Sequence, residues 1–194
     1  DLTRNLCGRL GCTGILSGYS RLFVDVNRDP RNPAWIPEVS DNILVPGNRD
    51  ISEAEIAHRK ASYYDPYHYA VEGLIENFLN QNVVPAVFSI HSFTPSLNGF
   101  DRPWHVGILW DRDERLALPL VDSLQVDSSI NVGKNQPYAG SDPSGYTIHV
   151  HGEERGVPVV AIEVRQDLID EFEGVKCWGD RLTQAIERTM RKSR

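Results

Sequence analysis

Cysteine is scarce in this sequence. The three that occur are Cys7, Cys12 and Cys177, an odd number without any CxxC pair. Such a set supports neither a disulfide framework nor a structural zinc knuckle. A reducing environment, and hence a cytoplasmic location, is therefore the expected setting.

Basic residues are outnumbered, because 20 Lys and Arg stand against 27 Asp and Glu and give a formal net charge of -7. A nucleic-acid-binding surface needs clustered Lys and Arg, so this composition argues against one. The sequence also lacks any apolar run approaching the ~18–20 residues that a membrane-spanning helix needs. We therefore expect neither nucleic acid nor a membrane as a partner.

A methionine start is lacking too, since the sequence begins at Asp1 and shows neither a secretory signal nor the composition of a transit peptide. We therefore expect the natural chain to have a further segment before Asp1. The 194 residues, 40% of them hydrophobic, suffice for one compact domain and leave little room for a second. Residues 1–194 are accordingly expected to form a single domain.

Apolar segments of strand type and helix type alternate along the chain. Residues 83–90 form a short apolar run rich in β-branched side chains, which is typical of a strand buried on both faces. The spacing Ser52-x-x-Glu55 matches a helix capping box. This alternation predicts an α/β three-layer sandwich, in which helices flank a mixed, mostly parallel central sheet.

The expected elements can be placed approximately. Helices are expected at about 2–10, 52–62, 66–82, 114–124 and 177–190. Strands are expected at about 15–16, 21–26, 83–90, 106–110, 147–150 and 157–164. Two stretches are expected to be loop, namely 31–49, whose length suggests a binding loop, and 127–146, which has room for one short strand at most.

Polar side chains lie at the ends of three predicted strands: Asn27-Arg28, His91, and Glu163 with Arg165. Ligands of open α/β sheets bind outside the carboxyl ends of the strands. An arginine fork binds a carboxylate, a histidine can ligate zinc, and a glutamate among apolar neighbours can accept a proton. Together these groups favour metal-assisted hydrolysis of an amide in a small acidic substrate. Strand ends collect polar residues in any α/β domain, however, so His91 also suits a structural role.

The other five histidines do not point to one function. His58 is expected to be solvated and His105 to be structural, whereas His68 could face a cleft. His149 and His151 lie two apart in a predicted strand, so both would face the same side. Such a pair can bind a metal ion, but it is more often part of a surface stripe.

The longer motifs resemble those of a known family. In chain order, the segments SRLFVDVNR, VPGN, YYDPYH, SIHSFTP, DRPWHVGIL, NQPY, HGEERGVP and IEVRQDLI are similar to the N-formylglutamate amidohydrolase family. The similarity extends from about residue 18 to the final helix. It implies a fold like that of zinc carboxypeptidases and aspartoacylase, with a mixed eight-stranded sheet and one zinc ion. The implied reaction is hydrolysis of N-formyl-L-glutamate to formate and glutamate, in the degradation of histidine.

The resemblance also implies roles for particular residues. His91 corresponds to a zinc ligand and Glu163 to the general base. Asn27 and Arg28 correspond to the pair that holds a substrate carboxylate, and Arg21 corresponds to the arginine that polarises the scissile carbonyl. For the second carboxylate of a glutamate-like substrate, the resemblance leaves open a choice between two further arginines, Arg102 and Arg165.

One part of the family's pattern has no counterpart in the sequence. The first metal-binding motif, a histidine followed closely by a second ligand, would precede Asp1. A catalytic zinc takes three protein ligands and keeps a position open for water, so the remaining ligands are expected upstream of Asp1. Two alternatives stay open. One is a related zinc N-acyl-amino-acid deacylase or carboxypeptidase-like amidase, and the other is a metal-free protein that binds acidic ligands.

Overall fold

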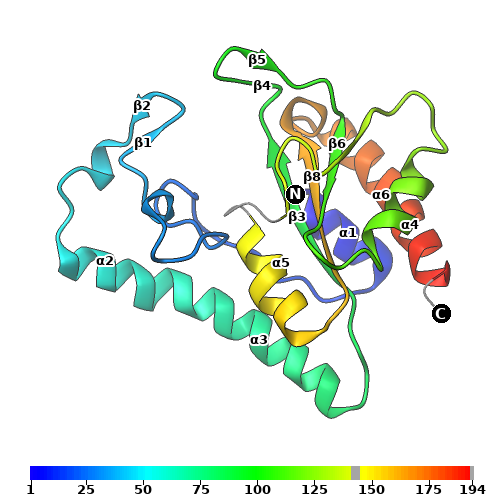
Figure 1. Ribbon diagram of the computed structural model, residues 1–194, viewed down its shortest axis with the longest axis horizontal. Helices are drawn as coiled ribbons and strands as arrows, with labels where there is room; N and C mark the ends of the chain where they lie inside the picture. The colour runs from blue at the N-terminus through cyan, green and yellow to red at the C-terminus, as the bar shows by residue number, and fades with distance from the viewer. Residues whose placement is uncertain (141–144, 193–194) are drawn as a thin grey trace. The chain divides into compact units, whose positions relative to one another are not determined.

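The computed structural model describes residues 1–140 and 145–192 (Figure 1). The chain divides into two compact units. The first, called here the sheet unit, comprises Asp1–Gly14 and Ala86–Arg194, and the second, called the inserted unit, comprises Ile15–Pro85. Among the described residues, no helix combines the length and the apolar character that a bilayer crossing requires.

The sheet unit is built on a four-stranded sheet with the strand order β3-β8-β6-β7. Its strands are β3 (Val87–Phe93), β6 (Val106–Leu109), β7 (Val132–Lys134) and β8 (Val159–Arg165). β3 pairs with β8 and β6 with β7 in parallel, whereas β6 and β8 are antiparallel. The expectation of a mixed, mostly parallel sheet is thus confirmed. Within the described residues this sheet has four strands, whereas the family resemblance implies a sheet of eight.

Helices cover both faces of this sheet (Figure 1). The helices of the unit are α1 (Leu2–Leu10), α4 (Ala117–Leu124), α5 (Tyr146–His151) and α6 (Phe172–Lys192). Side chains of α1, α4 and α6 pack in one cluster with Ile108 and Ile162 of the sheet. Ile148 of α5 packs in a second cluster with Val159 and Ala161, which lie on the opposite face because side chains alternate along a strand. The three-layer sandwich predicted from the sequence is therefore present within this unit.

A small hairpin, β4 (Ser96–Leu97) and β5 (Phe100–Asp101), follows β3. Its turn contains Asn98 and Gly99, both with positive φ, of 52° and 76°. Two residues in the left-handed region are what a tight two-residue hairpin turn demands, and Asn-Gly is the pair that adopts this conformation most readily. The hairpin leads the chain from β3 back toward β6.

The inserted unit is mainly helical. Its elements are the 3-10 turns η1 (Pro33–Trp35) and η2 (Pro46–Asn48), the hairpin β1 (Val39–Ser40) and β2 (Ile43–Leu44), and the helices α2 (Glu53–Arg59) and α3 (Asp65–Asn80). Ser52 caps α2, because its hydroxyl accepts the backbone N–H of Glu55 at 3.2 Å, as the capping-box spacing predicted. A π-helical turn, η3 (Lys60–Tyr64), joins α2 to α3. The buried side chains that hold the unit together include Val24, Trp35, Tyr64, Val71 and Ile75.

Three of the predicted strands are wrong. Residues 15–16 and 21–26 are not strands, and within the second stretch residues 21–23 and 26 lie in turns. Residues 147–150 belong to helix α5, in which Thr147, Ile148 and His151 are buried and His149 is exposed. Burial at positions i, i+1 and i+4 is the pattern of a helix with one buried face, so packing outweighs the β-branched composition of this segment.

Candidate functional site

His91 and Glu163 lie side by side on neighbouring strands. Strands β3 and β8 run parallel, and His91 is the register partner of Glu163. Alternation places His91 on the same face of β3 as Val87, and Glu163 on the same face of β8 as Val159. Both side chains therefore emerge on the face of the sheet that carries α5. The structure thus brings together the two residues that the sequence proposed as metal ligand and base.

His91 sits differently from the prediction. The sequence suggested that the strand ends at His91, whereas β3 continues for two further residues to Phe93. Pairing with β8 extends the strand, because residues 91–93 continue the parallel register with 163–165. Within β3, the Nε2 atom of His91 lies 2.8 Å from the hydroxyl oxygen of Ser89. Glu163 is buried, with 7% of its surface exposed.

A glycine on β6 lies beside Glu163, on the side away from His91. Gly107 of β6 is the antiparallel partner of Glu163. A Cβ atom at Gly107 would lie 1.9 Å from the backbone oxygen of Gln136, so a larger residue cannot occupy this position without displacing that backbone. Residues 135–138, the NQPY motif, are therefore packed directly against the strand beside Glu163. The sequence did not predict the role of Gly107, because the motif DRPWHVGIL that contains it does not show which distant backbone packs against it.

The two arginines considered for a second carboxylate have different environments. Arg102 is buried, and its Nη1 atom donates to the Thr94 hydroxyl at 3.2 Å and to the Tyr138 hydroxyl at 3.1 Å. Arg165 makes a two-pronged ion pair with Asp167, at 2.8 Å from Nε and 3.1 Å from Nη2. A fork that already holds a carboxylate is a poorer receptor for a second one.

The remaining three predicted residues lie together in the inserted unit, on residues 20–28, called here the anchor segment. Asp25, which is 5% exposed, accepts the backbone N–H of Asn27 at 2.9 Å. Its other carboxylate oxygen lies 2.9 Å from Nη2 of Arg21 and 3.9 Å from Nε of Arg28. The side chain of Arg21 is 63% exposed and that of Arg28 only 16%. One buried carboxylate thus orients both guanidinium groups.

The anchor segment turns twice, which explains why the strand predicted at 21–26 does not form. The backbone N–H of Phe23 bonds the carbonyl of Ser20 at 2.9 Å, and that of Arg28 bonds the carbonyl of Asp25 at 3.1 Å. Both are the short-range bonds of turns rather than of a sheet ladder. The turns present the Asn27-Arg28 pair from a loop that follows no strand.

A group of three potential metal ligands lies elsewhere in the sheet unit. One ligand atom each of Asp111, His149 and Glu153 lies within 4.8 Å of the other two. Oxygen and imidazole ligands of this kind are those that zinc accepts. Arg112 lies among them, however, with Nε 3.3 Å from Glu153 and 3.7 Å from Asp111. Its guanidinium already neutralises two of the three groups, so the arrangement fits an ion-pair network better than a cation site.

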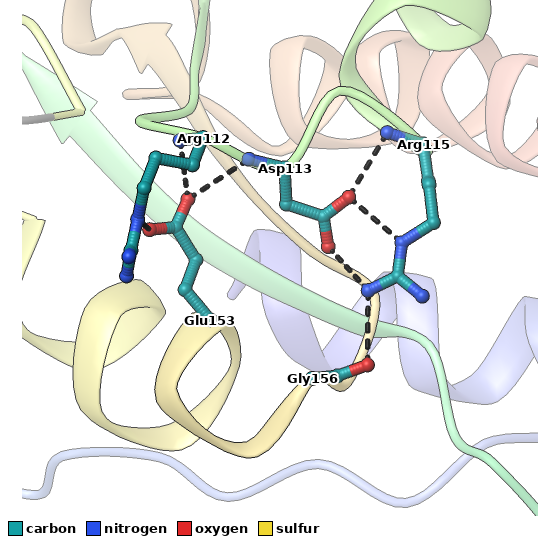
Figure 2. Close-up of polar contacts among 5 residues, drawn as sticks. All are labelled: Arg112, Asp113, Arg115, Glu153 and Gly156. Atoms are coloured by element: carbon teal, nitrogen blue, oxygen red, sulfur yellow. Dashed lines mark hydrogen bonds and ion pairs between the residues drawn. The ribbon is translucent and has the colours of Figure 1, made fainter.

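Figure 2 shows how Glu153, on the 3-10 turn η5 (Glu153–Arg155) that follows α5, is connected to the loop after β6. One oxygen of Glu153 accepts the backbone N–H groups of Arg112 at 2.8 Å and Asp113 at 3.1 Å. Asp113 in turn accepts from the backbone and the guanidinium of Arg115, whose Nη2 also donates to the carbonyl of Gly156 at 2.9 Å. The cluster fastens two segments of the sheet unit.

This cluster predicts a pH dependence of stability. Burial by itself raises the pKa of Glu153, but the hydrogen bonds from Arg112 and Asp113 outweigh it and place the pKa below the ordinary 4.5. A lowered pKa in the folded state contributes stability above the unfolded value and loses it as the pH falls through the folded value. We expect the free energy of unfolding in urea to fall as the pH drops below about 4.5. Glu153→Gln should lower it at pH 7 and make the acid-induced decline shallower.

The matched control is Glu154→Gln, because the neighbouring carboxylate is 55% exposed and is paired with His149. We expect this variant to follow the wild type across the whole pH range. An acid-induced decline that is equally steep in Glu153→Gln and in the wild type would contradict the stabilising role of Glu153.

The residues predicted from the sequence include only one candidate zinc ligand, His91. A catalytic zinc takes three protein ligands, so the residues assigned from the sequence do not complete such a site within the described residues. Of the other histidines, His105 accepts the backbone N–H of Asn131 at 2.9 Å through Nδ1, which fits the expected structural role. His58 is exposed, as expected.

The chain is similar to a known enzyme family and to solved structures. The family model described as N-formylglutamate amidohydrolase matches residues 2–170. A gene product of Agrobacterium tumefaciens, known from a crystal structure, is 30% identical and has a TM-score of 0.92, with 98% of this chain and 75% of that chain covered. An N-formylglutamate amidohydrolase from Ralstonia eutropha JMP134 is similar in fold, with 22% identity and a TM-score of 0.54 over 75% of this chain and 55% of that one. No curated protein matches the chain.

Proposed function

Because this chain belongs to the N-formylglutamate amidohydrolase family, we propose that it hydrolyses N-formyl-L-glutamate to formate and glutamate. The setting would be the degradation of histidine, as the family resemblance implies, in the cytoplasm, as the cysteine content suggests. The observation that carries the proposal is the pairing of His91 with Glu163 across β3 and β8. It places an imidazole beside a buried carboxylate within the part of the chain that the family model matches.

Glu163 is the proposed general base. Its carboxylate accepts a proton from the attacking water and delivers it to the nitrogen of the departing amine. Its position supports this role, because Glu163 is buried and lies beside His91 in the register of β3 and β8. His91 is proposed as one ligand of a zinc ion. Such an ion, when bound, lowers the pKa of a water molecule attached to it.

The anchor segment is the proposed carboxylate receptor. Arg28, with Asn27 beside it, would hold the α-carboxylate, since a guanidinium fork matches the two oxygens of a carboxylate. Arg21 would stabilise the oxyanion that develops on the formyl carbonyl. For the side-chain carboxylate we propose Arg102 rather than Arg165, because the fork of Arg165 is engaged by Asp167.

The direct test is hydrolysis by the purified full-length protein, with its metal content measured by elemental analysis. We expect about one zinc per chain and a preference for N-formylglutamate over N-formylaspartate and the two N-acetyl analogues. Removal of metal by a chelator should abolish hydrolysis, and added zinc should restore it. A preference for an N-acetyl substrate would instead identify a related deacylase. Binding of glutamate without hydrolysis, even with zinc present, would identify a metal-free binding protein and overturn the proposal.

A further inference from the structure

The side chains of Tyr64, in η3, and His68, in α3, bind the backbone on either side of Asn27. The hydroxyl of Tyr64 donates to the carbonyl of Arg28 at 2.9 Å, and Nε2 of His68 lies 3.0 Å from the carbonyl oxygen of Val26. A carbonyl oxygen can only accept, so the proton of this hydrogen bond is on Nε2 of His68. Asn27 is thereby held between the carbonyl groups of Val26 and Arg28, each of which accepts a hydrogen bond from a side chain.

Arg59 and Asn48 bind the backbone of the anchor segment before Asp25. Arg59, which is 5% exposed, donates from Nη1 to the carbonyl of Phe23 at 2.9 Å and to Oδ1 of Asn48 at 2.7 Å. Asn48 donates in turn to the carbonyls of Leu22 at 2.6 Å and Pro37 at 2.7 Å. The guanidinium carbon of Arg59 also lies 4.2 Å from the centre of the Phe23 ring. Buried and charge-assisted bonds of this kind are costly to break.

The π-helical turn η3 explains how one helical segment can supply three of these donors. In an uninterrupted α-helix, residues five apart lie ~140° apart around the axis. Arg59 and Tyr64 are five apart, and the wider turn between them absorbs the extra residue. His68 follows four residues later on α3, one ordinary turn further along. All three can therefore reach the same stretch of backbone.

We propose that Asn48, Arg59, Tyr64 and His68, called here the carbonyl clamp, are positioning residues that hold Asn27-Arg28 ready to receive a substrate carboxylate. This inference rests on the proposed function, because it assigns the clamp to the carboxylate receptor of that reaction. A misplacement of about 1 Å can cost ~10²-fold in rate, and a receptor fixed before binding loses less conformational entropy when the ligand arrives. The anchor segment is not part of a sheet, so side-chain donors supply the rigidity that a strand ladder would otherwise give.

The test removes single donors and leaves the anchor residues themselves unchanged. Tyr64→Phe deletes one hydroxyl, and we expect KM for N-formylglutamate to rise about tenfold with little change in kcat. The matched control is Tyr63→Phe, which deletes the hydroxyl of the adjacent tyrosine. The Tyr63 ring also packs against the anchor segment, edge-on to Phe23 with the ring centres 5.0 Å apart, but the hydrogen bond to the Arg28 carbonyl comes from Tyr64. This control should leave both constants within about twofold of the wild type.

A second substrate separates positioning from a general structural role. The α-amide of N-formylglutamate lacks the α-carboxylate, so Tyr64→Phe should leave its kcat/KM nearly unchanged. An equal loss on both substrates would overturn the proposal. The histidine gives an independent comparison, because glutamine can present an N–H donor where His68 presents Nε2. We expect His68→Gln to retain most of the affinity and His68→Leu to lose about tenfold, whereas an equal loss in both would overturn the proposal.

Binding of N-formylglutamate and glutamate by calorimetry distinguishes this inference from the reaction itself. A wild-type protein that binds these acids without hydrolysing them would refute the proposed function, and the clamp would then be judged by the Kd values of the same variants. A wild type that hydrolyses N-formylglutamate, with Tyr64→Phe and His68→Leu equal to it in KM and Kd, would refute the clamp and leave the function standing. If Tyr64→Phe does not fold, as thermal unfolding would reveal, the two His68 variants decide the question.

Discussion

Glu163→Gln is expected to lower kcat for N-formylglutamate by ~10²–10⁴-fold, the range typical for loss of a general acid–base group. Glutamine has nearly the same size and shape as glutamate, and position 163 lies inside β8 with its backbone paired to β3. We therefore expect the fold, the thermal unfolding temperature and the zinc content to change little. Single-turnover kinetics with metal analysis of the same samples would measure the effect.

The control for this experiment is Glu154→Gln, which removes a carboxylate of the same unit that is 55% exposed. It should leave kcat unchanged. If Glu163→Gln also hydrolysed N-formylglutamate at a near-normal rate, Glu163 would not be the base. If it lost its zinc, the residue would be better explained as a metal ligand or as a support for His91, its partner in the register.

Arg28→Lys is expected to raise KM for N-formylglutamate about 10- to 100-fold, because an ammonium group is a point charge and loses the two-pronged geometry. The loss should be equally large for N-formylnorvaline, which keeps the α-carboxylate and lacks the side-chain carboxylate. It should be small for the α-amide of N-formylglutamate. Steady-state kinetics with these three substrates would therefore show which carboxylate Arg28 binds.

Arg31→Lys provides a matched control for this substitution. Arg31 lies three residues further along the chain, its side chain is 90% exposed, and it forms an ion pair with Asp29. We expect KM to stay within about twofold of the wild type for all three substrates. An Arg28→Lys variant that loses as much activity on the α-amide as on N-formylglutamate would contradict the proposed carboxylate receptor.

The sequence predicted the sheet unit better than the inserted unit, and hydrogen bonding explains the difference. The apolar runs that became β6 and β8 are buried, so composition suffices to recognise them. The run that became β3 was expected to be buried on both faces, but β3 is the outermost strand in the order β3-β8-β6-β7 and most of its residues are only partly buried. Leu22, Val24 and Val26 recur at every second position as in a strand, yet they form no strand. The backbone carbonyls of Leu22, Phe23 and Val26 bind side chains from residues 48–68, and such distant partners cannot be inferred from local periodicity.

The candidate site was predictable to a similar extent. The motifs identified His91 and Glu163, and the structure makes them register partners, although the strand was expected to end at His91. Composition could not reveal that Asp25 orients Arg21 and Arg28, because an aspartate within an alternating segment looks like any solvent-facing residue. Nor could it rank Arg102 above Arg165, since that choice depends on a local ion pair.

The pairing of His91 with Glu163 has a consequence for the order in which the sheet forms. The two residues are distant in the sequence, and several helices and strands lie between β3 and β8, so these strands can join only after a long loop has closed. During synthesis the imidazole leaves the ribosome well before the carboxylate does. Until β8 has paired with β3, the imidazole of His91 therefore lacks the carboxylate that lies beside it in the folded sheet.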